Sequence, residues 1–312
     1  MQPTRPGEQS PRPAAVAQGR RRRIRFAGTP AREALEGALT AIAAAGVQTP
    51  RLDAELLLAH VLGVPRERLF TEAGLRVEGR AVRALQDAVR RRAVEREPVA
   101  YIVGRKGFRR LELAVDPRVL IPRPETELLV QTALALGYGG CVLDVGCGSG
   151  AVALALKDER PDLRVAGSEI SPDALYVAHA NAQRLGLEVR WLHADLLAGV
   201  PDEFDAVLAN LPYVAESERA ELAPEILRHE PPGALFAGPD GLSAIRELLD
   251  QIALRERIEL VGLEVGAGQA QAVCELTRAA GFRAVRAERD LAGVQRVVVG
   301  EGGTAPGGRG RR

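Results

Sequence analysis

From about residue 119 onward, short runs of apolar residues alternate with longer segments in which apolar residues recur every three or four positions. Runs of the first kind are typical of buried strands, and segments of the second kind are typical of amphipathic helices. Their alternation predicts an α/β fold with a doubly wound sheet. The predicted strands are Cys141–Val145, Leu163–Ser168, Glu188–Leu192, Phe204–Ala209, Ile258–Val265, Phe282–Arg286 and Val294–Val299.

The chain before residue 99 shows the helical pattern and predicts a small helical bundle. Thr29-Pro30 and Thr49-Pro50 each predict a helix start, with Thr as the N-cap and Pro at the first helical position. Gly46 and Gly63 end these two helices, and a third is predicted over residues 79–96. The predicted apolar faces comprise Leu52, Leu56, Ala59 and Leu62 in the second helix and Val82, Leu85, Val89 and Val94 in the third.

Composition and turn residues divide the chain into five predicted segments. Residues 1–28 are rich in Pro, Gln and Arg and lack the apolar core of a signal peptide, so we expect a disordered basic extension. The helical domain is expected at 29–98, a β-hairpin linker at 99–118 and the α/β domain at 119–301. A disordered tail is expected at 302–312.

The tetrapeptide Asn210-Leu211-Pro212-Tyr213 follows one of the predicted strands. The end of such a strand is the usual ligand position in an open α/β sheet. The Asn side-chain oxygen and a backbone carbonyl can accept the two hydrogens of a planar NH2 group, against which the Tyr ring can pack. The alternative is an ordinary Pro-containing turn.

A glycine-rich loop follows the strand Cys141–Val145 and opens a helix. Glycines allow a close approach of backbone to ligand, and the helix N-terminus attracts anions. The candidate cofactor-binding residues here are Asp144, Gly146, Cys147, Gly148, Ser149 and Gly150. Glu169, which ends the next predicted strand, is a candidate for the ribose hydroxyls. The loop also satisfies the loose dinucleotide pattern, so a nicotinamide enzyme is an alternative. Asp144 and the early position of Gly150 favour the Asp-x-Gly-x-Gly-x-Gly loop of S-adenosylmethionine enzymes, which the segment resembles.

Several further strings resemble those of the release factor glutamine methyltransferases over roughly residues 30 to 300. The strings are Glu97–Gly104, Leu120–Glu127, Glu230–Leu235, Asp240–Leu242 and Asp290–Gly293, together with the glycine loop and Asn210–Tyr213. The chain departs from the family at Leu211, where a Pro is usual, and at Arg109, where an aromatic residue is usual.

The resemblance implies a Rossmann-like methyltransferase that uses S-adenosylmethionine and N5-methylates the glutamine of the Gly-Gly-Gln motif in class I peptide chain release factors. It implies that Asp195 lies near the adenine amino group and that Leu196 flanks the ring. Asn210, Leu211, Pro212 and Tyr213 would bind the substrate glutamine and carry the catalysis. The helical domain would then dock the protein substrate, because a reactive loop alone offers few contacts.

Overall composition fits an enzyme of a reducing compartment. The net charge is +1 and the pI about 7.8, so no general attraction to nucleic acid is expected. The three cysteines are odd in number and lack metal-ligand spacing, which predicts neither a disulfide framework nor a metal site. No apolar stretch is long enough to span a membrane, so we expect a cytoplasmic protein.

Three other functions stay open from the sequence. An adenine-N6 methyltransferase carries a similar Asn-x-Pro-Tyr string, although the low aromatic content of 4% weighs against base clamping. A close relative that methylates a ribosomal-protein glutamine has the same core motifs. A non-catalytic cofactor-binding protein would not need Asn210 beside Tyr213.

Overall fold

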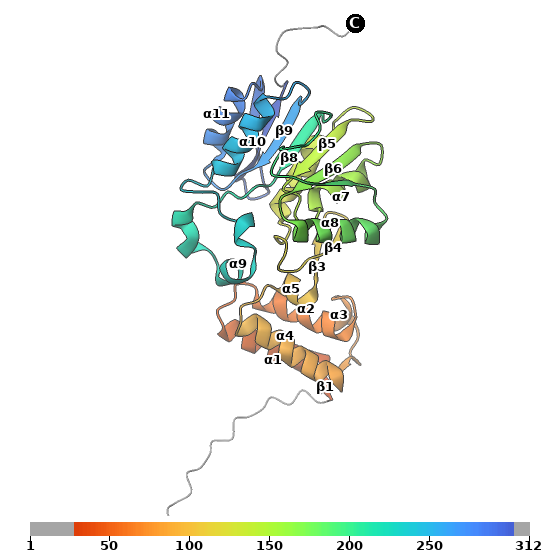
Figure 1. Cartoon of the computed structure of the whole chain (residues 1–312). Coiled ribbons are helices and arrows are strands. Elements are labelled where there is room, and N and C mark those ends of the chain that lie inside the picture. Colours follow the sequence, from red (N-terminus) through yellow and green to blue (C-terminus); the bar gives the residue numbers. More distant parts are fainter. Residues whose placement is uncertain (1–27, 303–312) are drawn as a thin grey trace, which may run out of the picture.

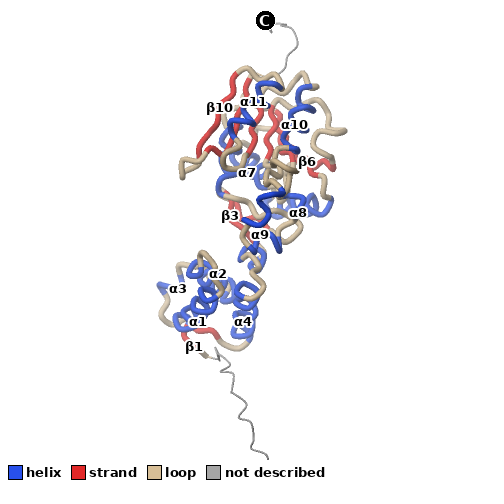
Figure 2. Tube along the Cα trace, turned by 90° about the vertical axis from the view of Figure 1, so that its left-hand side faces the viewer, coloured by secondary structure: helices blue, strands red, loops and turns tan. Residues whose placement is uncertain are grey.

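The structure, a computed structural model, describes residues 28–302 and has a helical part and a sheet part (Figure 1). Figure 2 shows the helical part beyond one end of the sheet part, joined to it by a narrow waist. The predicted disordered extension and tail lie outside the described residues, apart from Gly28 and Gly302.

The helical part is built around a core of its own. Its fully buried side chains include Ile42, Leu57, Leu58 and Leu85. Its elements are β1 (Thr29–Pro30), α1 (Ala31–Ala44), α2 (Pro50–Leu62), α3 (Arg68–Thr71), β2 (Arg76–Val77), α4 (Arg80–Ala93) and α5 (Val99–Val103).

The predicted apolar face of α2 is wrong at two of its four positions. Leu52 and Leu56 are 41% and 37% exposed, whereas Ala59 is buried as predicted and Leu62 is half-buried against the same core. Leu57 and Leu58 are fully buried as well, because the helix packs against α1, α4 and α5 and its buried side is broader than a single stripe.

The predicted third helix is α4, which is shorter than residues 79–96. Leu85 and Val89 are buried as predicted, and Val82 is half-buried. Val94 is 71% exposed because it follows the last helical residue.

One of the two predicted threonine N-caps is confirmed. Thr29 belongs to β1, so Pro30 is the N-cap of α1 and Ala31 its first residue. Thr49 is the N-cap of α2 and Pro50 its first residue, as predicted, although the Thr49 hydroxyl donates to Asp53 Oδ1 (2.9 Å) and makes no cap hydrogen bond to the backbone.

The linker between the two parts contains a helix as well as the predicted hairpin. Pro98 precedes the short helix α5, which Gly104 ends in the left-handed conformation (φ +76°). The antiparallel hairpin consists of β3 (Arg105–Phe108) and β4 (Leu111–Ala114).

The sheet has seven strands in the order β10-β11-β9-β8-β5-β6-β7. The central strands from β9 to β7 are parallel, and the two C-terminal strands add to the edge in antiparallel pairs. The strands are β5 (Cys141–Val145), β6 (Arg164–Glu169), β7 (Arg190–His193), β8 (Ala206–Ala209), β9 (Leu260–Glu264), β10 (Ala284–Arg289) and β11 (Gln295–Glu301). The predicted doubly wound α/β sheet is therefore confirmed.

Helices cover both faces of the sheet. Successive residues of a strand pack alternately into the hydrophobic cores on these two faces. Val142 packs toward the α6 and α7 side, for example, and Leu143 toward the α10 and α11 side. The elements of the first side are η1 (Pro124–Thr126), α6 (Glu127–Ala133), α7 (Ala151–Glu159) and α8 (Pro172–Leu185). Those of the second are α10 (Ser243–Ala253) and α11 (Ala270–Ala279).

The segment between β8 and α10 holds η2 (Glu216–Glu221), α9 (Pro224–His229) and η3 (Pro232–Ala234). Within residues 28–302, every helix is too short or too polar to cross a bilayer.

Candidate active site

A cavity of about 460 Å³ opens at the carboxyl ends of β5, β6 and β8. These strands are parallel neighbours, so residues that follow them meet at one edge of the sheet. The predicted site residues that line the cavity are Asp144, Gly146, Cys147, Gly148, Ser149, Glu169, Asp195, Leu196, Asn210, Leu211 and Pro212.

The glycine loop is tied to the end of β6. The Gly146 and Cys147 N–H groups donate to the Ser168 carbonyl (2.8 and 3.0 Å), and the Gly148 N–H donates to Glu169 Oε2 (3.0 Å). Gly146 and Gly148 are left-handed (φ +69° and +54°), a conformation that favours glycine. The loop and the Glu169 carboxylate therefore form one rigid unit on the cavity wall.

Asp144 is buried below this loop and holds the start of α7. Its Oδ2 accepts the Ala153 N–H (3.1 Å). Burial raises the pKa of Asp144 to about 7, and this hydrogen bond lowers it in part. The neighbouring Cys147 thiol is buried too, and burial raises its pKa well above its ordinary value. A thiol kept protonated is a poor nucleophile, so Cys147 contributes packing and a backbone N–H.

Two predicted residues do not line the cavity. Gly150, at φ +82°, faces the Trp191 indole: a Cβ added there would lie 2.9 Å from Trp191 Cη2. Gly167 makes room for the other edge of the ring, with Cζ3 at 2.5 Å from an added Cβ. The sequence assigned Gly150 to the cofactor, whereas the structure gives it this packing role.

Tyr213 is the second residue outside the cavity lining. Its ring lies beside Gly266, and its carbonyl accepts from Gln269 Nε2 (2.9 Å). Burial, followed by the nearby Glu264 carboxyl, raises the pKa of Tyr213 to about 12. A Cβ on Gly241 would lie 2.2 Å from the Tyr213 carbonyl oxygen, so glycine is required there. The structure thus places the predicted aromatic ring next to the cavity and outside its lining.

Asn210 has one half of its amide bound by the protein. Its Nδ2 donates to Thr126 Oγ1 (3.0 Å), and within residues 28–302 its Oδ1 accepts no hydrogen bond. Leu211 is buried with its side chain against Gly146, where an added Cβ would meet Leu211 Cδ2 at 3.1 Å. The departure from the family pattern at this position is therefore accommodated in the core.

Asp195 and Leu196 follow β7 and line the cavity on the other side of β5 and β6 from Asn210, which follows β8. Within residues 28–302, the Asp195 carboxylate has no hydrogen-bond partner and caps no helix. Leu196 is left-handed (φ +51°), a strained conformation for a side chain with a Cβ, and its carbonyl accepts from Ser168 Oγ (3.3 Å). The end of β6 thus holds both the glycine loop and the residues that the resemblance implies for adenine.

One wall of the cavity was not predicted from the sequence. It consists of the segments before α6, after β6 and around η3 and of part of α10, with Arg118, Val119, Leu120, Pro122, Thr126, Ile170, Ser171, Ala174, Pro231, Gly233, Ala234 and Glu247 in the lining. The string Leu120–Glu127 forms part of this wall. It supported the family resemblance, but no role in the site was predicted for it. Glu230, 3% exposed, accepts from Arg123 NH2 (2.5 Å) and the Ile121 N–H (3.3 Å), and so joins two of these segments.

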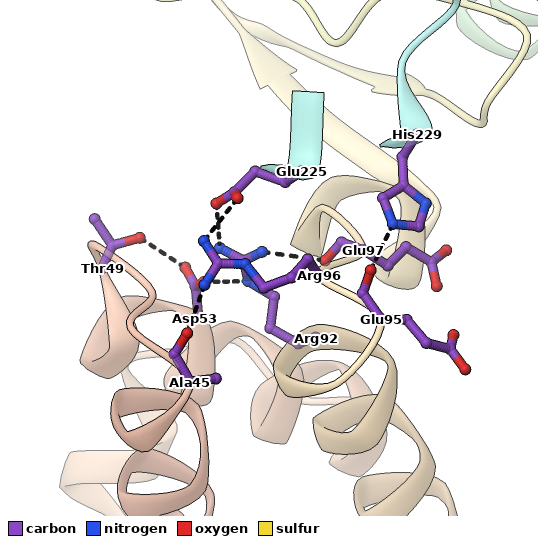
Figure 3. A network of polar contacts seen from close by, with 9 residues as sticks. All are labelled: Ala45, Thr49, Asp53, Arg92, Glu95, Arg96, Glu97, Glu225 and His229. Carbon is purple, nitrogen blue, oxygen red and sulfur yellow. Dashed lines mark hydrogen bonds and ion pairs between the residues drawn. The ribbon is translucent and has the colours of Figure 1, made fainter. Parts of the chain in front are cut away.

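The helical part is connected to this wall through α9 (Figure 3). Glu225 of α9 pairs with Arg92 NH2 (3.2 Å) and Arg96 NH2 (2.8 Å), and Arg92 Nε also pairs with Asp53 Oδ2 (2.6 Å). Burial raises the pKa of Glu225, but the arginine hydrogen bonds outweigh it and the net pKa is lowered. His229 Nε2 shares a hydrogen bond with the Glu95 carbonyl (2.8 Å). Pro231, two residues after His229, lines the cavity. One continuous stretch of chain therefore contains both the residue that pairs with the arginines and part of the cavity lining.

The cavity lining has chemistry that suits S-adenosylmethionine. The glycine loop and the helix α7 behind it suit a nucleoside with an amino-acid tail, and Glu169 and Asp195 supply acceptors for hydroxyl and amino groups. Within the described residues, no group of three or more His, Cys, Asp or Glu is placed to hold a metal ion.

Known families and structures match both parts of the chain. The PrmC N-terminal domain matches residues 33–104, and the methyltransferase small domain matches residues 124–236. Among solved structures, the hMettl16 catalytic domain in complex with the MAT2A 3′UTR hairpin 1 is 16% identical, covers 74% of this chain and 84% of that chain, and has a TM-score of 0.51. This likeness shows a methyltransferase fold.

Curated relatives match nearly the whole described chain. The release factor glutamine methyltransferase of Caulobacter vibrioides is 41% identical over 82% of this chain and 91% of its own. Those of Burkholderia pseudomallei and Mycolicibacterium smegmatis are 43% and 41% identical over 82% and 86% of this chain, and 92% and 96% of their own. The chain belongs to the release factor glutamine methyltransferases.

Proposed function

We propose that this protein transfers a methyl group from S-adenosylmethionine to the side-chain nitrogen of the glutamine in the Gly-Gly-Gln motif of class I peptide chain release factors. The observation that carries the proposal is the Asn210 amide, bound through Nδ2 and free at Oδ1, in one cavity with the glycine loop. A carboxamide in this state offers an acceptor, which a substrate NH2 group needs.

An amide nitrogen is a poor nucleophile because its lone pair is delocalised into the carbonyl. S-adenosylmethionine supplies an electrophilic methyl group. The residues of the site must therefore orient the nitrogen and weaken the delocalisation of its lone pair. Asn210 Oδ1 and the Leu211 carbonyl would accept the two amide hydrogens and fix the nitrogen in place. These hydrogens become more acidic as the nitrogen reacts, so the same acceptors bind the transition state more strongly than the ground state. Pro212 would keep Leu211 extended, and Tyr213 would support the amide plane from beside the cavity.

The cofactor would lie along the opposite wall. We assign the ribose to Glu169, the adenine to Asp195 and Leu196, and the amino-acid tail to the glycine loop. Gly146, Cys147, Gly148 and Ser149 bring backbone close to it, and Asp144 holds the loop on α7. Gly150 ends this loop and leaves room for the Trp191 indole.

The helical domain, residues 29–98, would dock the release factor. It contributes no residue to the cavity lining, yet its arginines reach the segment that does. Deletion of residues 1–98 should therefore preserve cofactor binding and strongly lower methylation of an intact release factor. Calorimetry with the cofactor and methyl transfer to the factor measure the two effects, and a folded truncation with full methylation would show that the domain does not dock the substrate. Because release factors act in translation, we place the protein in the cytoplasm.

The decisive experiment uses full-length protein, methyl-labelled cofactor and three acceptors: a class I release factor, the same factor with its motif Gln replaced by Ala, and adenine-containing RNA. Label in the glutamine of the first acceptor alone is the expected result. Label in RNA would favour the adenine-N6 alternative, and label in the Ala-substituted factor would place the reaction at another residue.

A further inference from the structure

Two neighbouring strands bring Asn210 and Glu264 together. β8 and β9 are parallel, with Ala209 opposite Leu263, so the next residue of each strand lies at the same level of the sheet. Both side chains belong to the face covered by α6. Leu208, two residues before Asn210, packs on that face, and a Cβ on Gly262, two before Glu264, would meet α6 residues.

Thr126 lies above both side chains, directly before α6. It is 4% exposed, and its Oγ1 accepts the Asn210 Nδ2 hydrogen (3.0 Å). A hydroxyl that accepts in this way still has its own hydrogen to donate. The hydroxyl lies beside the Glu264 carboxyl and lowers the pKa of that carboxyl. The three residues therefore lie in a row that ends in the cavity.

Glu264 is unusual for a core residue. It is 2% exposed, and its Oε2 is buried with no hydrogen-bond partner within residues 28–302. Burial raises its pKa to about 7, opposed by the Thr126 hydrogen bond and by Arg296 and Arg123, and assisted by Glu125. A carboxyl in such a position costs stability, and packing alone would be served better by an apolar side chain.

The direction of the Thr126 hydroxyl decides which half of the Asn210 amide faces the substrate. With its hydrogen held by Glu264, Thr126 presents lone pairs to Asn210, so the NH2 group must turn toward Thr126. A flipped amide would set oxygen against oxygen there and would aim its NH2 at the substrate NH2. Without an acceptor at Glu264, Thr126 is free to donate to Asn210 Oδ1 and to stabilise the flipped amide.

We propose, resting on the proposed function, that Glu264 and Thr126 are positioning residues: Glu264 orients the Thr126 hydroxyl, and Thr126 orients Asn210 so that Oδ1 receives the substrate amide. Neither residue touches the reacting atoms. Both act through the orientation of Asn210.

The first test compares Thr126→Val, which removes the hydroxyl at nearly constant shape, with Thr126→Ser, which keeps it. Thr132→Val is the matched control: Thr132 lies in α6, and its hydroxyl donates to the Leu129 carbonyl (2.7 Å), away from Asn210. We expect T126V to lower kcat about 10–100-fold, as loss of an outer-shell partner commonly does. Cofactor affinity should stay within about threefold, T126S should restore most of the rate, and T132V should turn over like the unmodified enzyme.

Near-normal kcat for T126V overturns the proposal, and so does a T126S enzyme as slow as T126V, or a T132V enzyme that loses as much. These outcomes differ from a failure of the proposed function, in which the unmodified enzyme places no label in the release-factor glutamine.

The second test is the pH profile of kcat with Glu264→Gln. A protonated Glu264 carboxyl has a hydrogen of its own to donate to Thr126 Oγ1, which leaves the Thr126 hydroxyl free to turn its hydrogen toward Asn210 Oδ1. The rate of the unmodified enzyme should therefore fall as pH drops through about 7. The groups that share this environment are Glu125, Arg123, Arg296 and Tyr213, and E264Q leaves all of them in place. E264Q should lack this acid limb. An acid limb that persists unchanged in E264Q removes Glu264 from the relay.

Discussion

At the scale of single residues, the site depends on groups whose hydrogen-bonding capacity is only half used. Asn210 is bound at Nδ2 and open at Oδ1, and the Glu169 carboxylate receives one backbone N–H on each oxygen while keeping lone pairs for a ligand. Such side chains are held in place before the ligand arrives, so little ordering remains to be done on binding.

Asn210→Ala should lower turnover by about 10²–10³-fold, comparable to the loss of one preorganised polar group. Cofactor affinity should change by no more than about threefold, because Ala removes nothing from the glycine loop or from Glu169. Single-turnover methyl transfer and calorimetry separate the two. Gln271→Ala, on the exposed face of α11, is the control. A turnover close to the unmodified value would exclude the proposed role of Asn210.

Asp144→Asn should change how stability depends on pH. The folded-state pKa of Asp144 is raised to about 7 from 3.8, so the folded protein holds a proton that the unfolded chain has released. The stabilisation is fully present below about pH 4 and is lost as pH rises through 7. Between pH 5 and pH 8, this one group should lower the free energy of unfolding by about 2–3 kcal/mol. The Asn variant, which can still accept from Ala153, should lack this loss. Denaturant titrations at the two pH values measure it, and parallel pH dependence of both proteins would contradict it.

At the scale of elements, the glycine loop depends on the side chain beneath it. Gly150→Ala places a Cβ 2.9 Å from Trp191, whereas Gly186→Ala meets nothing within 4 Å at a similar φ (+82° and +67°). Both variants bear the cost of a left-handed alanine, so their difference isolates the overpacking. We expect G150A to be less stable than G186A by about 1–3 kcal/mol in chemical denaturation. Equal stabilities would mean that Trp191 moves aside freely.

The sequence predicted best those elements whose residues all lie in the same surroundings, such as a strand buried on both faces. The strand Cys141–Val145 is buried on both faces and has the predicted bounds, because it is apolar except at Asp144 and glycines stand on both sides of it. β7 starts two residues later than predicted, since pairing with β6 begins only at Arg190. The face of α2 was mistaken at Leu52 and Leu56 because three helices surround it, and because Asp53 is buried with Arg92. Neither partner of this ion pair is evident from local sequence.

The candidate site divides in the same way. Residues within motifs, such as Gly146, Glu169 and Asn210, line the cavity as expected, because each lies at or just after the end of a strand. Thr126 and Glu264 were given no role because they meet Asn210 only through the order of β8 and β9 and the position of α6. Such contacts join residues far apart in the sequence, which local patterns do not encode.

At the scale of the whole molecule, Glu225 connects the helical part, which we propose docks the substrate, to the sheet part that holds the cavity. Its two arginine partners come from the helical part, and its own helix leads to the cavity rim. The pairs are largely shielded from water, so removal of the carboxylate leaves Arg92 and Arg96 without their shared counter-charge.

Glu225→Gln should therefore weaken methylation of an intact release factor by raising its KM about three- to tenfold, with cofactor affinity unchanged. Glu221→Gln, at the exposed end of η2, is the matched control. Initial rates over a range of release-factor concentrations measure the change. If E225Q matches E221Q in KM, the ion pairs do not transmit docking to the site.

The indole that Gly150 and Gly167 accommodate also gives the molecule a built-in optical reporter. Trp191 is the single tryptophan of the 312 residues, it belongs to β7, and the helical part has none. Its emission therefore comes from the sheet part alone, next to the loop on which the cofactor would rest. Unfolding followed by tryptophan fluorescence reports this part separately, whereas circular dichroism, dominated by helices, follows both. A gap between the two transitions would measure directly how far the two parts of the chain melt independently.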